Sequence, residues 1–200
     1  MSNMQSWKQN VGSIINYAER IFPEVEIVSR ALSGEIVKSN YGQVAKRAKK
    51  LGSSLEAYGI KHGQNVGSLA LNTYRNMEMY YGISGMGAVM HTINFRLHPE
   101  QVVYIINHAE NRIIFLETVF APLLEAIQAN CPTVEKYVLL CSKEEMPETT
   151  LKDAISYEEF IDDGDESYEW PELEEDAPCG LCYTSGTVSY THLRAHETHE

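Results

Sequence analysis

The chain has 200 residues, of which 44% are hydrophobic and 22% charged, a composition typical of globular proteins and not of disordered ones. Its formal net charge of −12 excludes nucleic acid as a partner, because the phosphates would be repelled. Neither a run of about 18 apolar residues nor the apolar stretch of a secretory signal occurs. We therefore expect a cytoplasmic protein with no transmembrane segment; peripheral membrane contact and oligomeric state stay open.

The first clear element is an amphipathic helix over residues 41–58. Apolar side chains recur there at spacings of three and four, while Lys46, Arg47, Lys49 and Lys50 occupy the other face. Gly59 follows directly and is placed to end the helix.

Short apolar strands and helical segments alternate along the rest of the chain. Strands are predicted at residues 66–71, 88–93, 112–117, 134–141 and 180–184. Helices are predicted after Thr73 as a cap, from His98-Pro99-Glu100, over 118–130 with Thr118 as a cap, and over 155–161. This order predicts an α/β fold, a parallel sheet with helices on both faces and right-handed crossovers. In the helix after Thr73, a stripe of methionine and tyrosine side chains is expected to belong to the core: Met77, Tyr80, Tyr81 and, on the same side, Ser84.

Residues 143–176 hold 15 acidic residues against two lysines, which predicts a solvated excursion between packed elements. The cysteines Cys179 and Cys182 have the spacing of a redox or half-zinc motif, but in an extended strand side chains three apart point to opposite faces. No second cysteine pair stands at zinc spacing, so we expect no metal site there.

A polar turn, Thr184-Ser185-Gly186-Thr187, follows the last predicted strand. Three hydroxyl groups surround a glycine whose missing side chain lets backbone N–H groups approach a ligand, an arrangement that can bind a polyphosphate. Serine, glycine and threonine also form ordinary turns, and the common phosphate-binding loop ending in Gly-Lys is absent. Ligands of open parallel sheets bind beyond the carboxyl ends of the strands, so the position favours a site.

The sequence DAPCGLCYTSGT, residues 176–187, resembles the start of the phosphate-binding signature of the AMP-forming acyl-CoA synthetases, the adenylate-forming enzyme superfamily. Residues 71–117 resemble the same family in segment after segment, nearest to bacterial ligases for medium- and long-chain fatty acids. The resemblance implies an enzyme that forms an acyl-adenylate from a carboxylate and ATP and then a thioester with coenzyme A, with Mg²⁺ as cofactor. It also implies that Thr184, Ser185, Gly186 and Thr187 hold the β- and γ-phosphates of ATP.

The resemblance ends after Thr187. Family members continue with threonine, glycine, a variable residue, proline and lysine, whereas this chain has Val188, Ser189, Tyr190, Thr191 and His192. Residues 188–198 resemble one translated frame of a common sequencing adapter. Residues 1–187 are therefore expected to be the incomplete N-terminal part of the large adenylation domain, and residues 188–200 a non-native tail. The catalytic residues are expected to lie beyond this part and are unknown.

Three other functions stay open. The chain could derive from another acid–CoA ligase, for an aryl or short-chain acid, or be a non-catalytic α/β interaction module. It could also be a metal-binding protein, since His192, His196 and His199 would share one face of a helix beside Glu200. On the adapter interpretation no metal site exists, and the fragment is expected to be inactive.

Overall fold

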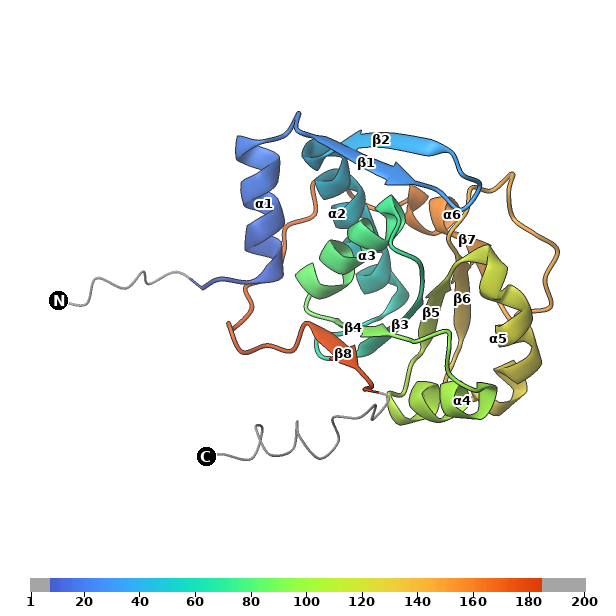
Figure 1. The fold of residues 1–200 in the computed structure, drawn as a ribbon. Helices are drawn as coiled ribbons and strands as arrows, with labels where there is room; N and C mark the ends of the chain where they lie inside the picture. Colours follow the sequence, from blue (N-terminus) through green and yellow to red (C-terminus); the bar gives the residue numbers. More distant parts are fainter. Residues whose placement is uncertain (1–7, 185–200) are drawn as a thin grey trace.

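The computed structural model describes residues 8–184 and contains a six-stranded parallel sheet in the order β7-β6-β5-β3-β4-β8 (Figure 1). The strands are β3 (Asn65–Leu69), β4 (Val89–Thr92), β5 (Ile113–Leu116), β6 (Lys136–Leu139), β7 (Ala154–Ser156) and β8 (Gly180–Cys182). Every pair of neighbouring strands in it is parallel. The predicted α/β class is confirmed.

Helices pack on both faces of this sheet. On one face, α4 (Pro99–His108) and α5 (Ala121–Ile127) share a core with the strands through side chains such as Ile106 and Leu124. On the other face, α2 (Tyr41–Tyr58), α3 (Tyr74–Gly85) and α6 (Tyr157–Asp162) build a second core, to which Leu51, Ile83 and Ile161 contribute. These two cores fix the sheet between two helical layers.

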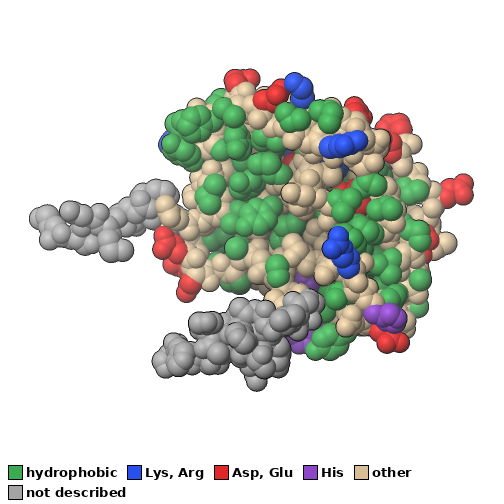
Figure 2. Space-filling view, viewed as in Figure 1, with side chains coloured by type: hydrophobic (Ala, Val, Ile, Leu, Met, Phe, Trp, Pro, Cys, Tyr) green, Lys and Arg blue, Asp and Glu red, His purple; other side chains and the backbone are tan. Residues whose placement is uncertain are grey.

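A third layer lies outside α2 and α3. It consists of α1 (Val11–Ile21) and the antiparallel hairpin of β1 (Glu26–Arg30) and β2 (Ile36–Asn40) (Figure 1). Ile15 of α1 is fully buried, but Ile14 and Tyr17 are 57% and 55% exposed. Hydrophobic side chains consequently gather on the outer surface over α1 (Figure 2). In the part of the chain that the structure describes, no helix is long and apolar enough to cross a membrane.

The helix over residues 41–58 is confirmed as α2. The side chain of Asn40 accepts a hydrogen bond from the backbone N–H of Gln43 and begins the helix. Gly59 ends it at a φ of 93°, in the left-handed region that glycine adopts without strain. Pro99 in the first turn of α4 is confirmed as well.

Two predicted helices differ from the structure. Residues 118–130 form three pieces, η1 (Thr118–Phe120), α5 and η2 (Gln128–Asn130). Thr118 is the first residue of η1 and does not cap it, because Glu117 occupies the cap position. Pro122 explains the first break, because its missing N–H is tolerated only in the first turn of a helix. Residues 154–156 are strand β7, and α6 starts only at Tyr157, after its cap Ser156.

The expected core stripe on α3 is wrong for Tyr80, which is 48% exposed. The buried side is centred on Met79, Gly82 and Ile83. A Cβ atom on Gly82 would lie 2.9 Å from the carbonyl oxygen of Ala48, so the glycine lets α3 approach α2 closely. That close approach turns the glycine side of α3 inward and leaves Tyr80 outside.

The acidic segment 143–176 is not merely a solvated excursion, which corrects that prediction. It supplies β7 and α6, and its Trp170 lies where side chains of Gly12, Gly52 and Gly85 would otherwise be. Cβ atoms on these glycines would approach the Trp170 side chain to 2.9, 2.9 and 3.0 Å. Apart from Glu158, which bonds Arg47, most acidic side chains of the segment are exposed while the apolar ones pack, so the segment holds α1, α2 and α3 together.

Candidate functional site

Thr184, the first residue of the predicted phosphate loop, lies two residues after the edge strand β8 and is exposed. Because β8 is parallel to β4, Thr184 lies at the same end of the sheet as the carboxyl ends of the other strands (Figure 1). Ser185, Gly186 and Thr187 lie outside the described residues. The structure therefore places the beginning of the loop at the predicted end of the sheet, and the phosphate-binding role of all four residues remains a prediction.

The strand that leads to Thr184 is held by side chains of two neighbouring elements. Cys182 Sγ lies 3.0 Å from Thr92 Oγ1 at the end of β4. The hydroxyl oxygen of Tyr183 lies 2.6 Å from Nδ1 of His108, in the last turn of α4. The Tyr183 ring also packs on the ring of His91, with 5.2 Å between their centroids.

His91 forms a buried, uncharged support beneath Tyr183. It is 0% exposed, and its Nδ1 lies 2.7 Å from Oδ1 of Asn111. Burial lowers the pKa of His91 below its ordinary value, and the hydrogen bond to Asn111 only partly opposes this. Nε2 of His91 has no hydrogen-bond partner among the described residues.

A second polar group lies at the carboxyl ends of β3 and β5, where the following helices α3 and α5 leave for opposite faces of the sheet. Glu117 is 4% exposed there, and its Oε1 accepts a hydrogen bond of 3.4 Å from the Thr73 hydroxyl. Burial raises the pKa of Glu117. The carboxyl group borders a hollow of about 300 Å³ that Arg75 and Cys141 also line.

Sequence reasoning missed Glu117 as a candidate site residue. The signal was present, because a charged residue directly follows the buried strand RIIFL at the end where ligands of parallel sheets bind. Its burial, however, depends on the β3–α3 connection, which is more than 40 residues away in the chain.

A buried ion-pair network joins α2, α3 and α6 on the opposite face of the sheet from Tyr183. Arg47 donates hydrogen bonds to Glu78 (2.7 Å) and to both carboxylate oxygens of Glu158 (2.9 and 3.0 Å). The Tyr157 hydroxyl donates to Glu78, whose side chain is only 1% exposed. Burial raises the pKa of Glu78. Burial also opposes the ionisation of Glu158, but the guanidinium groups of Arg47 and Arg75 hold the pKa of Glu158 below its ordinary value. The network stabilises the helical layer.

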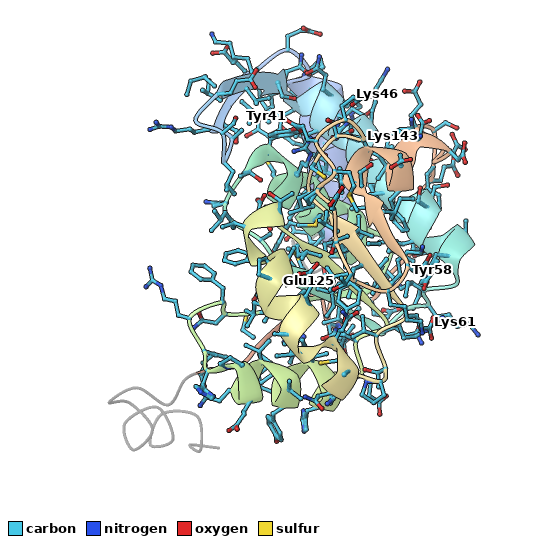
Figure 3. All side chains as sticks on the ribbon, turned by 90° about the vertical axis from the view of Figure 1, so that its right-hand side faces the viewer. Tyr41, Lys46, Tyr58, Lys61, Glu125 and Lys143 are labelled. Carbon is cyan, nitrogen blue, oxygen red and sulfur yellow. The ribbon has the colours of Figure 1, made fainter. Side chains whose placement is uncertain are left out.

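Other charged side chains lie on the outside of this layer. Lys46 and Lys61 lie near opposite ends of α2, and Lys143 lies close to α6, where it pairs with Glu159 at 3.0 Å (Figure 3). The predicted basic face of α2 is partly wrong, because Arg47 points into the network described above and Lys49 pairs with Glu19 at 2.6 Å.

Between residues 8 and 184, no group of three or more histidine, cysteine or acidic side chains could hold a metal ion. His192, His196, His199 and Glu200 lie outside these residues, so the alternative metal site stays a prediction.

Comparisons with known proteins agree on one family. The family model described as AMP-binding enzyme matches residues 20–189. A 3-methylmercaptopropionyl-CoA ligase of Ruegeria pomeroyi is 42% identical over 178 residues, and a medium-chain-fatty-acid–CoA ligase of Ectopseudomonas oleovorans is 38% identical. Both alignments cover 89% of this chain and 33% of the relative, so the chain spans about a third of their length.

Solved structures show the same fold. The crystal structure of an anthranilate CoA ligase in complex with anthranoyl-AMP has a TM-score of 0.78 at 23% identity, covering 92% of this chain and 33% of that protein. A long-chain-fatty-acid-CoA ligase from Archaeoglobus fulgidus has a TM-score of 0.77 at 19% identity, covering 93% and 36%. With a family model matched over most of its length, the chain belongs to the AMP-binding enzymes, the AMP-forming acid–CoA ligases and their relatives.

Proposed function

We propose that the full-length protein containing this segment is an ATP-dependent, AMP-forming ligase that joins a medium- or long-chain fatty acid to coenzyme A. The observation that carries the proposal is the position of Thr184 at the carboxyl end of a parallel strand, as the first residue of the sequence Thr-Ser-Gly-Thr, within a family match over residues 20–189. The names of the relatives support the acid class, since two of them are a medium-chain and a long-chain fatty-acid–CoA ligase.

The reaction has two steps. A carboxylate oxygen attacks the α-phosphorus of ATP, an O–P bond forms, and pyrophosphate leaves with the electrons of the broken bond. The sulfur of coenzyme A then attacks the acyl carbon, a C–S bond forms, AMP leaves, and the thiol proton passes to solvent or a base.

In the first step this segment would bind the β- and γ-phosphates, both in bound ATP and while the pyrophosphate departs. The hydroxyls of Thr184, Ser185 and Thr187 and the backbone N–H groups around Gly186 would donate hydrogen bonds to the β- and γ-phosphates. Mg²⁺, when bound, would neutralise part of the charge that develops on the pyrophosphate. The exposed Thr184 fits this role, because its hydroxyl is accessible to a ligand at the end of the sheet.

We also propose that residues 1–187 are a piece of the large domain, that residues 188–200 are a translated adapter, and that the 200-residue chain is inactive alone. In support, the chain spans about a third of its relatives, and the family match stops at residue 189. The test is to sequence an independent copy of the gene past the codon of Thr187. A continuation that encodes threonine, glycine, a variable residue, proline and lysine is expected, and an identical histidine-rich ending would contradict the proposal.

A second substrate class has specific support. Relatives that are 42% and 40% identical are named 3-methylmercaptopropionyl-CoA ligases, and their acid is short and carries a thioether. The two classes differ in the length of the chain behind the carboxylate, so a substrate series separates them.

The decisive experiment measures acid-dependent ATP–pyrophosphate exchange by the full-length protein, with 3-methylmercaptopropionate, butyrate, octanoate, palmitate and benzoate. We expect exchange with octanoate or palmitate. Replacing both Thr184 and Ser185 with alanine should abolish most of it, whereas Thr149→Ala, which removes a hydroxyl that binds Glu125 far from β8, should not. Unchanged exchange in the double variant would favour a module whose turn binds nothing, and exchange with 3-methylmercaptopropionate alone would favour the second class.

A further inference from the structure

Three aromatic side chains form a small cluster between the end of β8 and the helix α4. The cluster consists of His91, His108 and Tyr183. Tyr183 joins the other two, because its hydroxyl meets Nδ1 of His108 at 2.6 Å and its ring packs on His91. It is also partly buried against the core that the sheet shares with α4 and α5.

The backbone alone holds this part of the chain weakly. Strand β8 has three residues, of which Gly180 and Cys182 are exposed, and its only described partner strand is β4. The registered backbone pairs end at Cys182, opposite Thr92. Beyond that point, the Tyr183 side chain provides the contacts that tie the chain to the body of the protein.

His91 is buried, and the exposed His108 is carried by a helix that packs on the sheet. His108 lies in the last turn of α4, which packs through Val102, Ile105 and Ile106 on the sheet. His91 is fully buried and paired with Asn111. Tyr183 therefore contacts two supports that come from different elements, 75 and 92 residues away in the chain.

We propose that Tyr183 is a positioning residue, anchored by His108 and His91, that fixes the direction in which the chain presents Thr184 to the phosphates of ATP. The inference rests on the proposed function. It assigns Tyr183 an effect on ATP affinity that acts through the placement of Thr184.

The kinetics distinguish positioning from a purely structural role. A loop that binds the phosphates equally in the ground state and the transition state affects KM, whereas a loss of folded protein lowers the apparent kcat and leaves KM unchanged. In the full-length ligase, we expect Tyr183→Phe to raise the KM for ATP about fivefold, the typical effect of one lost hydrogen bond. The KM for the acid and kcat should stay within about twofold.

Variants of His108 test the anchor. Asparagine places an oxygen near the position of Nδ1 and can accept from Tyr183, so His108→Asn should keep the KM for ATP near the wild-type value. His108→Leu should raise the KM for ATP as much as Tyr183→Phe does. The double variant that combines His108→Leu with Tyr183→Phe should have the same KM for ATP as either single variant, because all three lose the same contact. Tyr17→Phe, which removes the hydroxyl of a tyrosine on α1 that is 55% exposed, is the matched control and should change nothing.

A second measurement needs no activity. The measurement uses the full-length protein labelled with ¹⁵N at histidine. If Tyr183 donates to Nδ1 of His108, the proton of the neutral His108 ring lies on Nε2. Tyr183→Phe should then shift the Nδ1 resonance of His108.

The possible results separate the two proposals. No ATP–pyrophosphate exchange by the wild-type full-length protein would overturn the proposed function. If the wild-type protein exchanges and Tyr183→Phe leaves the KM for ATP unchanged, or lowers kcat alone, only the positioning role is overturned. An Nδ1 resonance of His108 that does not shift in Tyr183→Phe would overturn it as well.

Discussion

The two edges of the sheet are both strands of three residues, but they are protected very differently. After β7 the chain turns inward, since Ser156 and Tyr157 are 0% exposed, and charged residues flank the strand at Lys152, Asp153 and Glu158. Around β8, residues 177–184 include no charged residue, and Cys182 and Thr184 are exposed. Charges and burial are how proteins prevent edge strands from pairing with other chains, so the β7 edge is complete by itself, whereas the β8 edge depends on what covers it.

The largest effect is expected in the ion-pair network behind the β7 edge. Arg47→Met leaves the carboxylate of Glu78 buried without its main partner, which should lower the free energy of unfolding by about 3–5 kcal/mol. Burial already raises the pKa of Glu78, so the loss should be greatest above that pKa and shrink as the pH falls and Glu78 becomes protonated. Urea unfolding at several pH values measures this.

Lys143→Met is the matched control, because Lys143 is 72% exposed and pairs with Glu159 at the surface. It should change the free energy of unfolding by less than about 0.5 kcal/mol. Equal effects of the two substitutions would show that the buried network does not support this edge.

The second-largest effect on the free energy of unfolding is expected in the segment between β7 and β8, which contains Trp170. Trp170→Ala should cost about 3 kcal/mol, because the cavity would lie between three glycines that have no side chains to fill it. Trp170→Phe should recover part of the loss. A near-zero effect in thermal or urea unfolding would mean that the segment is only loosely attached to α1, α2 and α3.

A smaller, pH-dependent effect is expected at Glu158. Its pKa is lowered in the folded protein, so its ionised form contributes stability that is present above the unfolded-state pKa and is lost as the pH falls through the folded-state pKa. Glu158→Gln should therefore cost about 1–2 kcal/mol at neutral pH, and the difference from wild type should vanish in acid. Parallel unfolding curves at neutral pH and near pH 3 test the sign; a difference that grows in acid would contradict it.

The smallest effect on stability is expected at the β8 edge, where the main effect should be on the association of chains. Cys182→Lys places a charge on the exposed side of β8, so it should reduce self-association of the 200-residue chain in sedimentation while changing the free energy of unfolding by less than about 0.5 kcal/mol. Ala154→Lys on β7 should leave association unchanged. If instead the wild-type chain is monodisperse, the β8 edge is not exposed to pairing.

The same contrast explains what the sequence could predict. The helix over residues 41–58 and its glycine end are confirmed because apolar periodicity and a left-handed glycine are local signals. Five strands of the parallel sheet, β3, β4, β5, β6 and β8, are found within a few residues, whereas β1, β2 and β7 were not predicted as strands. The parallel arrangement places the end of β8 with the other carboxyl ends. The position of Thr184 followed from that topology alone.

Features set by distant partners were not predictable in this way. The exposure of Tyr80 depends on how closely Gly82 lets α3 approach α2, and the packing of the partly buried Trp170 depends on three glycines that are distant from it in the chain. The contact between Tyr183 and His108 likewise joins residues 75 positions apart. Composition described residues 143–176 as acidic, but it could not reveal that their few apolar side chains hold three helices.

The packing of Trp170 against α1 also determines when α1 can finish folding during synthesis. The indole Nε1 donates a hydrogen bond of 3.1 Å to Asn16, so α1 cannot complete its packing until a residue 154 positions later has been made. At about 5–20 residues per second, this interval is roughly 8–30 seconds. During that time the apolar side of α1 is available to chaperones, so α1 completes its packing long after it has been synthesised.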